Sequence, residues 1–408
     1  MFNAPLVTPE SEVTAAVALH YVPFQSFANE STYEYADSGA LARQQWSNKV
    51  HMEVQKQTFF VRHGFIGSDE GNEDSPFETK ANFPLVTRDE IGKGKGATVT
   101  IPMALQLTNA GGNGNEALIG SSPTKIEKIE WAYATCKLEQ KRFAVQYDGP
   151  MSEIRNPAHG KELCTHLLTN RFVKWYERDI FYTFLNGSSQ HLVARGLTSA
   201  VAHPNQYYGI NKASINNMVD SDVPCLAWLN FIKLFIRLKH INPIKMPDSS
   251  TGHVLVMHDL QMEKMFEDQA YVRALENARP REKTGNPLWD DADHVYRGIH
   301  FYATDQVLQP NDSPHGQVAG WEDMYGAILL GGNAMGLASG GIGTRGLDKV
   351  RYGIVPSYEN DFDNDVKYAL RTVCGNALAT YTRETAGTLL NQSSGLFWTK
   401  ANSNPFAS

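Results

Sequence analysis

Cysteine is scarce in this chain of 408 residues, which contains only Cys136, Cys164, Cys225 and Cys374. The four are far apart and none forms a C-x-x-C pair, so the sequence indicates neither a zinc site nor a disulfide framework. Reduced thiols, as in a cytoplasm, are the default expectation.

Long apolar runs are also missing. No stretch has the roughly 20 consecutive apolar residues that a transmembrane helix needs. The first residues, MFNAPLVTPESEV, lack the basic start and apolar core of a signal peptide. We therefore expect no membrane partner.

The chain has no excess of basic residues. Its 37 Lys and Arg residues stand against 44 Asp and Glu residues, a formal net charge of −7. This balance argues against an ordinary nucleic-acid-binding protein.

Two glycine-rich motifs resemble nucleotide-binding loops but lack the features that nucleotide binding requires. Residues 341–346, GIGTRG, match G-x-G-x-x-G, but a dinucleotide site needs a following βαβ unit, and the remaining chain has the pattern of strands. Residues 92–98, GKGKGAT, lack the Gly-Lys-Ser/Thr spacing of a phosphate-binding loop. A flexible glycine turn and an exposed basic turn are the simpler interpretations.

Metal and catalytic motifs are equally weak. Residues 361–365, DFDND, have the carboxylate spacing of a calcium loop, but Val366 stands where the turn glycine is required. That interpretation leaves a weak cation site open beside a solvated acidic turn. Residues 290–294, DDADH, could ligate a metal but are more simply a polar surface loop, and the chain has no H-E-x-x-H or G-x-S-x-G motif. We expect no catalytic, cofactor-binding or metal-binding residues, no cofactor, and no enzyme activity.

What the chain does have is ample material for a core. Hydrophobic residues make up 42% and aromatic residues 11% of the composition, with no signature of disorder. The length exceeds a typical single domain, so two lobes or a large insertion are expected.

The prediction centres on one long helix over residues 157–186. Asn156-Pro157 is a start signal and Asn186-Gly187 is a stop signal. Apolar residues fill about half of the helical wheel and, in the C-terminal half, the other side too, so several elements must cover the helix. These residues are Leu163, Leu167, Leu168, Phe172, Val173, Trp175, Tyr176, Ile180, Phe181, Phe184 and Leu185.

A basic line runs along the same predicted helix. It consists of Arg171, Lys174 and Arg178. Two interpretations stay open: a solvated face with local carboxylate partners such as Glu177, or contacts to another subunit.

A long hairpin is predicted before the helix. Apolar residues alternate over residues 97–107, and Pro102 within that strand predicts an edge position or a bulge. A polar, glycine-rich tip follows at 108–122. In the return strand the alternation slips between Thr135 and Lys141, which predicts a bulge or break. Two strands cannot bury their apolar faces alone, so the hairpin should lie on another element.

The other elements follow from periodicity and turn signals. Residues 38–62 read as a helix, and residues 67–78 as an exposed acidic loop. The tail, residues 387–408, is expected to be polar and partly ordered only on assembly. Further helices are predicted at 224–239 and 260–277, and strands at 253–257, 298–303, 325–330 and 365–380.

The order of several segments resembles a known family. KGKGATVTIP at 93–102 is followed by RFAV at 142–145, Met151-Ser152 and the long helix. VLVMH at 254–258, YRGI at 296–299 and AILLG at 327–331 continue the series. This order is similar to that of the major capsid proteins of tailed bacteriophages that have the Hong Kong 97-type fold. The resemblance covers most of residues 44–380, and its specificity lies in order and spacing.

The resemblance implies an α+β capsid fold with five parts. Residues 1–65 would form an N-terminal arm and helix, and residues 66–148 the extended loop, a long β-hairpin with its tip at 108–122. Residues 149–191 would form the peripheral domain with its spine helix, residues 192–351 the axial domain, and residues 352–408 the return strands of the peripheral domain and a C-terminal tail.

The resemblance also implies a function. The chain would be a major capsid protein that self-assembles as hexamers and pentamers into the icosahedral shell around the double-stranded DNA genome of a tailed phage. Its implied partners are other copies of itself, portal, scaffolding and decoration proteins, and packaged DNA contacted non-specifically. Its implied place is the virion, after assembly in the host bacterial cytoplasm.

Two other functions are alternatives to this one. An encapsulin-like shell protein of a cytoplasmic compartment has the same fold and stays open as the alternative. A glycan- or protein-binding module on a virion surface would be rich in short, regularly spaced strands, and the long helix argues against it.

Overall fold

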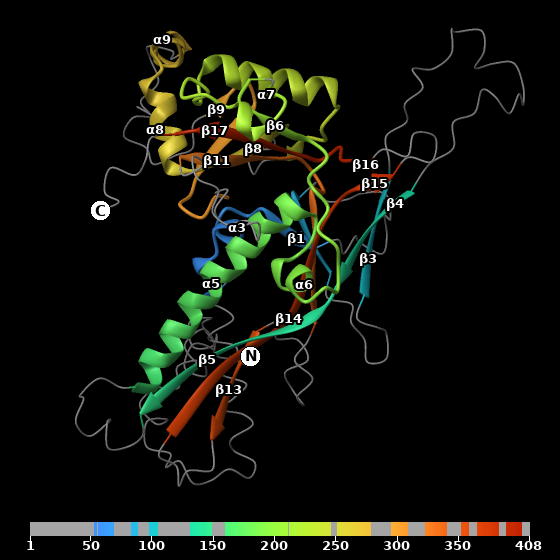
Figure 1. The fold of residues 1–408 in the computed structure, drawn as a ribbon, viewed down its shortest axis with the longest axis vertical. Coiled ribbons are helices and arrows are strands. Elements are labelled where there is room, and N and C mark those ends of the chain that lie inside the picture. Colours follow the sequence, from blue (N-terminus) through green and yellow to red (C-terminus); the bar gives the residue numbers. More distant parts are fainter. Residues whose placement is uncertain are drawn as a thin grey trace, which may run out of the picture. The chain divides into compact units, whose positions relative to one another are not determined.

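A computed structural model describes thirteen segments of the chain, all within the unit Trp46–Ser408. The other unit, Met1–Gln45, lies outside the described residues. Helices and strands are mixed along the chain, so the predicted α+β class is confirmed (Figure 1). The described segments are residues 53–54, 56–68, 83–88, 98–104, 131–148, 160–210, 212–245, 251–278, 295–308, 323–340, 352–358, 365–382 and 389–401.

A seven-stranded sheet forms the core of one half of the unit. Its order is β6-β17-β11-β8-β10-β9, with β7 paired to β8. The predicted strands at 253–257, 298–303 and 325–330 are confirmed as β8, β10 and β11. The bounds are β6 Gln206–Tyr208, β7 Ile244–Lys245, β8 Thr251–Met257, β9 Val295–Tyr296, β10 Ile299–Ala303, β11 Met324–Leu330 and β17 Ser394–Lys400.

Both faces of this sheet are buried. In β8, Leu255 and Met257 pack into a core under helix α7 (Leu226–Leu238), whereas Val254 and Val256 pack into a second core. That second core also contains residues of helix α5 and of the other large sheet. A strand buried on both faces needs an unbroken apolar run, which VLVM in β8 provides.

Strand β17 contradicts the prediction of a polar tail ordered on assembly. It lies between β6 and β11, and Phe397 is fully buried among the aromatic rings of Tyr207, Trp228 and Phe235. The prediction was wrong because polar residues on both sides dominate the composition of this stretch. The strand itself is short and apolar, and the strands that pair with it are far away in sequence. The tail prediction is therefore wrong for Ser394–Lys400.

A six-stranded sheet forms the core of the other half. Its order is β1-β2-β12-β14-β13, and β5 also pairs with β14. The long strand β14 confirms the strand predicted at 365–380, and helix α5 packs against β14 and β5. The bounds are β1 Ile66–Ser68, β2 Leu85–Arg88, β5 Glu139–Asp148, β12 Met335–Gly340, β13 Tyr352–Tyr358 and β14 Asp365–Leu378.

The long helix α5, Gly160–Asn186, is confirmed, and it ends where predicted. Gly187 has φ +75° and its N–H donates to the carbonyl of Thr183, as expected for a glycine that terminates a helix. The predicted start at Pro157 lies outside the described residues. Several elements cover the helix: Phe143 of β5 contacts Trp175, and Phe60 of α3 contacts Phe181. Leu163 and Leu167, in contrast, remain about half exposed.

The predicted helix at 38–62 is described only from Glu53 onward. It is interrupted at Thr58, which precedes the short helix α3, Phe59–Arg62. The rings of His63 and Phe65 then contact Tyr302 of β10, so this segment lies between α5 and the seven-stranded sheet. Residues 67–68, expected in a loop, belong instead to β1.

The helix predicted at 260–277 is two helices, α8 Asp259–Glu267 and α9 Gln269–Ala278. Asp268 separates them because its carboxylate has two other partners. One oxygen accepts from the N–H of Ala270 at the start of α9, and the other accepts from the N–H of Leu226 at the start of α7. The helix predicted at 224–239 is confirmed as α7.

Replacing Phe397 by alanine should strongly destabilise the protein. The large buried ring would leave a cavity under α7, which costs about 3–5 kcal/mol in free energy of unfolding. Urea unfolding measures the loss. Val219→Ala, at a half-exposed position, is the matched control and should change stability by less than about 0.5 kcal/mol. A Phe397→Ala protein as stable as this control would contradict the placement of β17.

Candidate functional site

A two-stranded arm leaves the six-stranded sheet at Leu138. Strands β3 (Thr98–Ala104) and β4 (Trp131–Lys137) pair only with each other among the described strands. The chain then passes Leu138 and continues as β5 in the six-stranded sheet. The predicted break between Thr135 and Lys141 is therefore confirmed, and so is the edge position of Pro102. The predicted tip at 108–122 lies outside the described residues.

The root of this arm is packed tightly onto β14. Cys136 and Leu138 are buried with Ala338 and Ala377. A side chain at Gly375 would meet the carbonyl oxygen of Lys137 at 1.8 Å, so only glycine allows the two backbones to approach this closely. The arm is thus held by backbone as well as side-chain contact.

The buried thiols at this root are structural. Burial raises the pKa of Cys136 to about 12, and it raises the pKa of Cys374 still further above its usual range. Both thiols stay protonated at neutral pH, and a protonated thiol is a poor nucleophile. All four cysteines are free in the structure.

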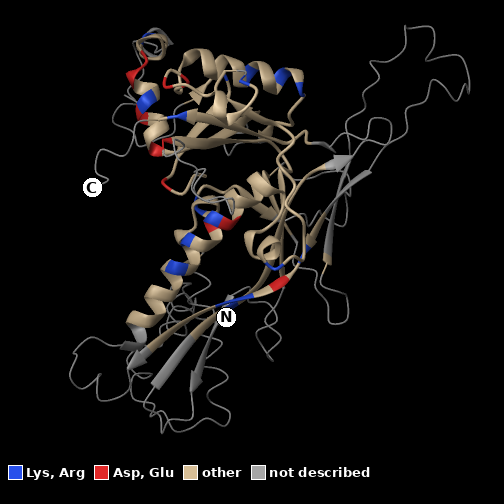
Figure 2. Ribbon diagram, in the orientation of Figure 1, with Lys and Arg blue, Asp and Glu red and all other residues tan. Residues whose placement is uncertain are grey.

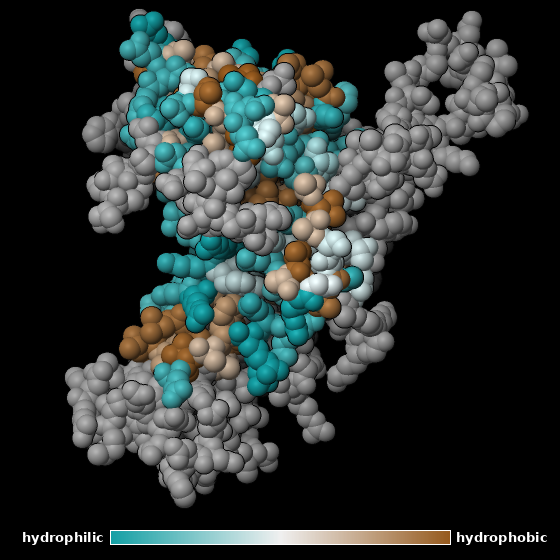
Figure 3. Space-filling view, viewed as in Figure 1, coloured by the Kyte–Doolittle hydropathy of each residue, from teal (hydrophilic) through white to brown (hydrophobic). Residues whose placement is uncertain are grey.

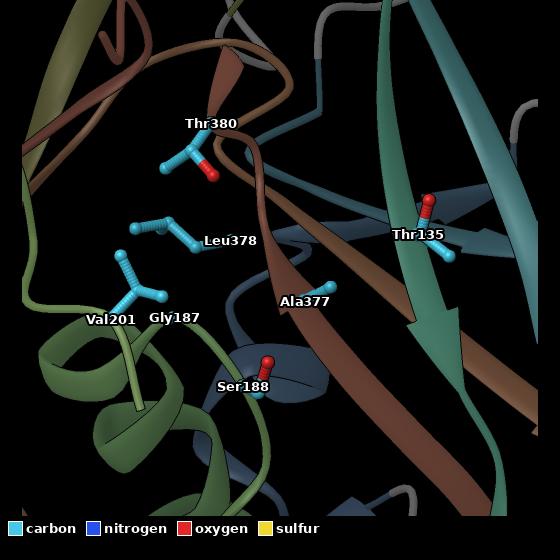
Figure 4. A pocket seen from close by; sticks show the side chains of 7 residues that line it. All are labelled: Thr135, Gly187, Ser188, Val201, Ala377, Leu378 and Thr380. Atoms are coloured by element: carbon cyan, nitrogen blue, oxygen red, sulfur yellow. The ribbon is translucent and has the colours of Figure 1, made fainter. Parts of the chain in front are cut away.

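A shallow hollow of about 180 Å³ lies beside the arm's root. Figure 4 shows its lining side chains on β4, the turn after α5, the loop at Val201 and the end of β14. None of the described residues that line it has an ionisable side chain, so these residues supply neither an acid–base pair nor charged metal ligands. The lining residues are Thr135, Gly187, Ser188, Val201, Ala377, Leu378 and Thr380.

A buried carboxylate fixes the bend after α5. Asp179 is 1% exposed, and its oxygens accept from the backbone N–H of Gln190 at 2.8 Å and from Nδ2 of Asn376 at 2.9 Å. These bonds join α5 to α6 (Gln190–Ala194) and to β14. The imidazole of His191 lies 3.8 Å from the same carboxylate. Hydrogen bonds to a charged acceptor are among the stronger ones, so this group orients three elements together.

Two exposed contacts tie the same region to the arm. Arg195, just after α6, pairs with Glu139 at the start of β5. Nζ of Lys137 at the end of β4 donates to the carbonyl of Leu197. Exposed ion pairs contribute little to the free energy of unfolding. One of these two contacts lies before Leu138 and the other after it, so together they restrict rotation of the arm at this break.

A second buried polar network holds β17. Nδ1 of His203 accepts from the N–H of Asn205, which leaves the proton on Nε2 to donate to Oγ of Ser394 at 3.0 Å. Nδ2 of Asn205 donates to the carbonyls of Asn391 and Ser394. Complete burial lowers the pKa of His203 to about 3, so the imidazole is neutral in the folded protein.

The carboxylate of Glu177, suggested above as a partner for the basic line on α5, points away from that line. Arg171, Lys174 and Arg178 are exposed, and Figure 2 shows the basic residues along the helix. Glu177 instead turns inward, is 7% exposed, and accepts from the N–H of Phe59. Burial raises its pKa. The guanidinium of Arg171 lies over the ring of Phe143, 5.6 Å from its centre.

Most residues of the motifs considered from the sequence are not among those that the structure describes. Residues 92–97, 290–294, 341–346, 361 and 363 lie outside the described residues. Within the part that the structure describes, no three His, Cys, Asp or Glu side chains are placed to hold a metal ion. No described helix is long and apolar enough to cross a membrane.

Comparison with known proteins decides the family. A family model described as phage capsid protein matches residues 34–388. The chain belongs to the phage capsid protein family. This capsid protein matches no curated protein sequence.

Solved structures agree on the fold. The capsid of Ralstonia phage GP4 has a TM-score of 0.61 at 16% identity, over 86% of this chain and 93% of that chain. The Cyanophage Pam1 capsid has 0.58 at 17% identity, over 91% and 100%. The capsid of Helicobacter pylori bacteriophage KHP30 has 0.57 at 10% identity, over 84% and 92%. The fold of this capsid protein is therefore the predicted Hong Kong 97-type fold.

The function follows from the family. The chain is a structural protein, a major capsid protein whose copies assemble into the shell of a virion. The alternative of a compartment shell is not favoured, because the matching family and the three structures described above are all phage capsids.

Acid should destabilise the capsid protein through His203. Its folded-state pKa lies near 3, below the usual 6.5, so the unfolded state binds a proton that the folded state does not. The stability is therefore present above about pH 6.5 and is lost as pH falls toward 3, by about 1.4 kcal/mol per pH unit. Replacing His203 by asparagine, which keeps an acceptor for the N–H of Asn205, should remove about one proton from the pH dependence of urea unfolding. An unchanged slope would contradict a buried neutral imidazole.

Proposed function

We propose that this capsid protein assembles as hexamers and pentamers into an icosahedral shell that encloses the double-stranded DNA of a tailed phage. The arm β3–β4 carries the proposal. A two-stranded pair is marginally stable by itself in water, yet this one departs from a root that buried packing and a glycine contact hold in place. An arm with a fixed root, to which no third strand among the described residues is added, is suited to lie on a neighbouring subunit.

The domains are proposed to correspond to the parts of the fold. Residues 1–65 are the N-terminal arm and helix. Residues 66–148 contain the extended loop, whose described part is β3–β4, whereas β1, β2 and β5 in the same range pair in the six-stranded sheet. Residues 149–191 with return strands from 352–408 form the peripheral domain, and residues 192–351 the axial domain. Because β17 pairs with β11, we assign it to the axial domain rather than to a tail.

Other partners are proposed from the same role. Portal and scaffolding proteins, and decoration proteins, would contact the shell, and packaged DNA would contact it without sequence preference. The net charge of −7 supports loose confinement of DNA, since tight binding needs a basic surface. Assembly would take place in the host bacterial cytoplasm, and the protein would carry out no catalysis.

Deleting residues 110–120, in the predicted tip, should separate folding from assembly. The root of the arm lies outside the deletion, so the subunit should stay folded, with unchanged circular dichroism. It should no longer form closed particles in electron microscopy, whereas the intact chain should form particles of uniform diameter. Intact shells from the deletion variant would contradict an intersubunit role for the loop.

A further inference from the structure

The outer face of helix α7 carries apolar side chains that nothing in the described chain covers. Its inner face is buried on the seven-stranded sheet through residues such as Trp228 and Ile232. On the opposite face Leu234 is 52% exposed and Leu238, one turn later, is 68% exposed. Figure 3 shows hydrophobic surface over this helix. Other apolar side chains of this half, such as Val219 and Val295, are also about half exposed, but Leu234 and Leu238 lie one turn apart on the same helix face. They form a continuous apolar strip that is suited to contact another surface.

Positive charge is concentrated beside these leucines. Lys233 and Arg237 lie on α7, and Arg297 lies in the turn between β9 and β10. The pKa of Lys233 is lowered, first by partial burial and then by the positive charges of Arg237 and Arg297. Among the ion pairs of the described residues, none involves these three side chains.

Arg297 is held in position rather than free in solvent. Its Nη1 donates to Oδ1 of Asn230 on α7 at 3.1 Å, and the hydroxyl of Tyr296 donates to the same oxygen at 3.0 Å. The guanidinium lies 5.5 Å from the centre of the Tyr296 ring. Its backbone has φ +49°, which non-glycine residues adopt rarely. The turn thus keeps a cation next to α7, prepared for an anionic partner.

We propose that this α7 face, made of Lys233, Leu234, Arg237, Leu238 and Arg297, binds the acidic segment 69–78 of a neighbouring copy of the chain. The inference rests on the proposed assembly of many copies.

The proposed segment matches the face in both charge and apolarity. DEGNEDSPFE contains five carboxylates and Phe77 within ten residues. It joins β1 to β2 of the six-stranded sheet, whereas α7 lies on the seven-stranded sheet. The carboxylates would pair with the three cations, and Phe77 would cover the two leucines.

Other occupants fit less well. Nucleic acid would pair with the cations, but its phosphates would gain nothing from two exposed leucines. The other acidic stretches offer fewer carboxylates: residues 359–365 have four, and residues 290–293 have three.

Disulfide trapping in the full-length chain tests the contact directly. Chains carrying Leu238→Cys are mixed with chains carrying Phe77→Cys, co-assembled and oxidised. A covalent dimer should form in the mixture and in neither variant alone, and Leu197→Cys, at another exposed leucine, should give no dimer with Phe77→Cys. Absence of the dimer would overturn the proposal. So would a link within one chain of the double variant, or a Trp289→Cys chain that links to Leu238→Cys in place of Phe77→Cys.

Charge reversal tests the same contact by function. Arg237→Glu with Arg297→Glu should lower the yield of particles at least tenfold while the subunit stays folded, and adding Asp69→Lys with Asp74→Lys should restore it. Arg273→Glu, on the exposed surface of α9, is the control and should assemble normally.

The outcomes separate this inference from the proposed function. If the intact chain forms no shells, the proposed function fails. If the intact and reversed chains assemble equally well, the docking inference fails while the proposed function stands. Loss of DNA retention with normal particle yield would also overturn it in favour of a nucleic-acid surface.

Discussion

Two-sided burial of the seven-stranded sheet is the constraint on which the rest of the subunit depends. Alternate residues of β8, β11 and β17 enter two different cores, one under α7 and one shared with α5 and the six-stranded sheet. Disturbing the face that is shared with α5 therefore affects both halves of the unit. The segment around α3 strengthens this link, because its aromatic rings contact Phe181 of α5 through Phe60 and Tyr302 of β10 through Phe65.

The junction after α5 fixes the direction in which the arm β3–β4 leaves the body of the subunit. Asp179 joins the helix to α6 and β14, and Gly375 of β14 lets the backbone of β4 lie directly against it. The arm therefore leaves the body from a point where three elements are fixed. A shell protein needs this property, because small angular errors in each subunit would add up across a closed lattice.

Much of this fold could be predicted from local signals. Gly187 ends α5 because a left-handed residue is needed there, and Pro102 lies in an edge strand because it lacks an N–H to donate. The loss of alternation near Leu138 marked the passage between sheets. Each of these signals lies within a few residues of the feature it predicts.

The features that were missed depend on partners distant in sequence. Strand β17 pairs with β11 and β6, and nothing within residues 394–400 shows this. Asp268 interrupts a continuous helical pattern because its carboxylate is used by Leu226, 42 residues earlier. The sequence around Gly375 does not show that the carbonyl of Lys137 lies against it. Nor does the sequence around Glu177 show that its carboxylate accepts from the N–H of Phe59 and is buried.

The position of β17 also determines the order in which the sheet can close during translation. The ribosome makes the other six strands of the sheet first, and β17 must then enter between β6 and β11. Until residue 400 is made, the aromatic side of α7 lacks Phe397 and the edge of β11 is open. At high expression, that open edge is a site where the β17 of another nascent chain can pair, giving a strand-swapped dimer in place of a subunit ready for the shell.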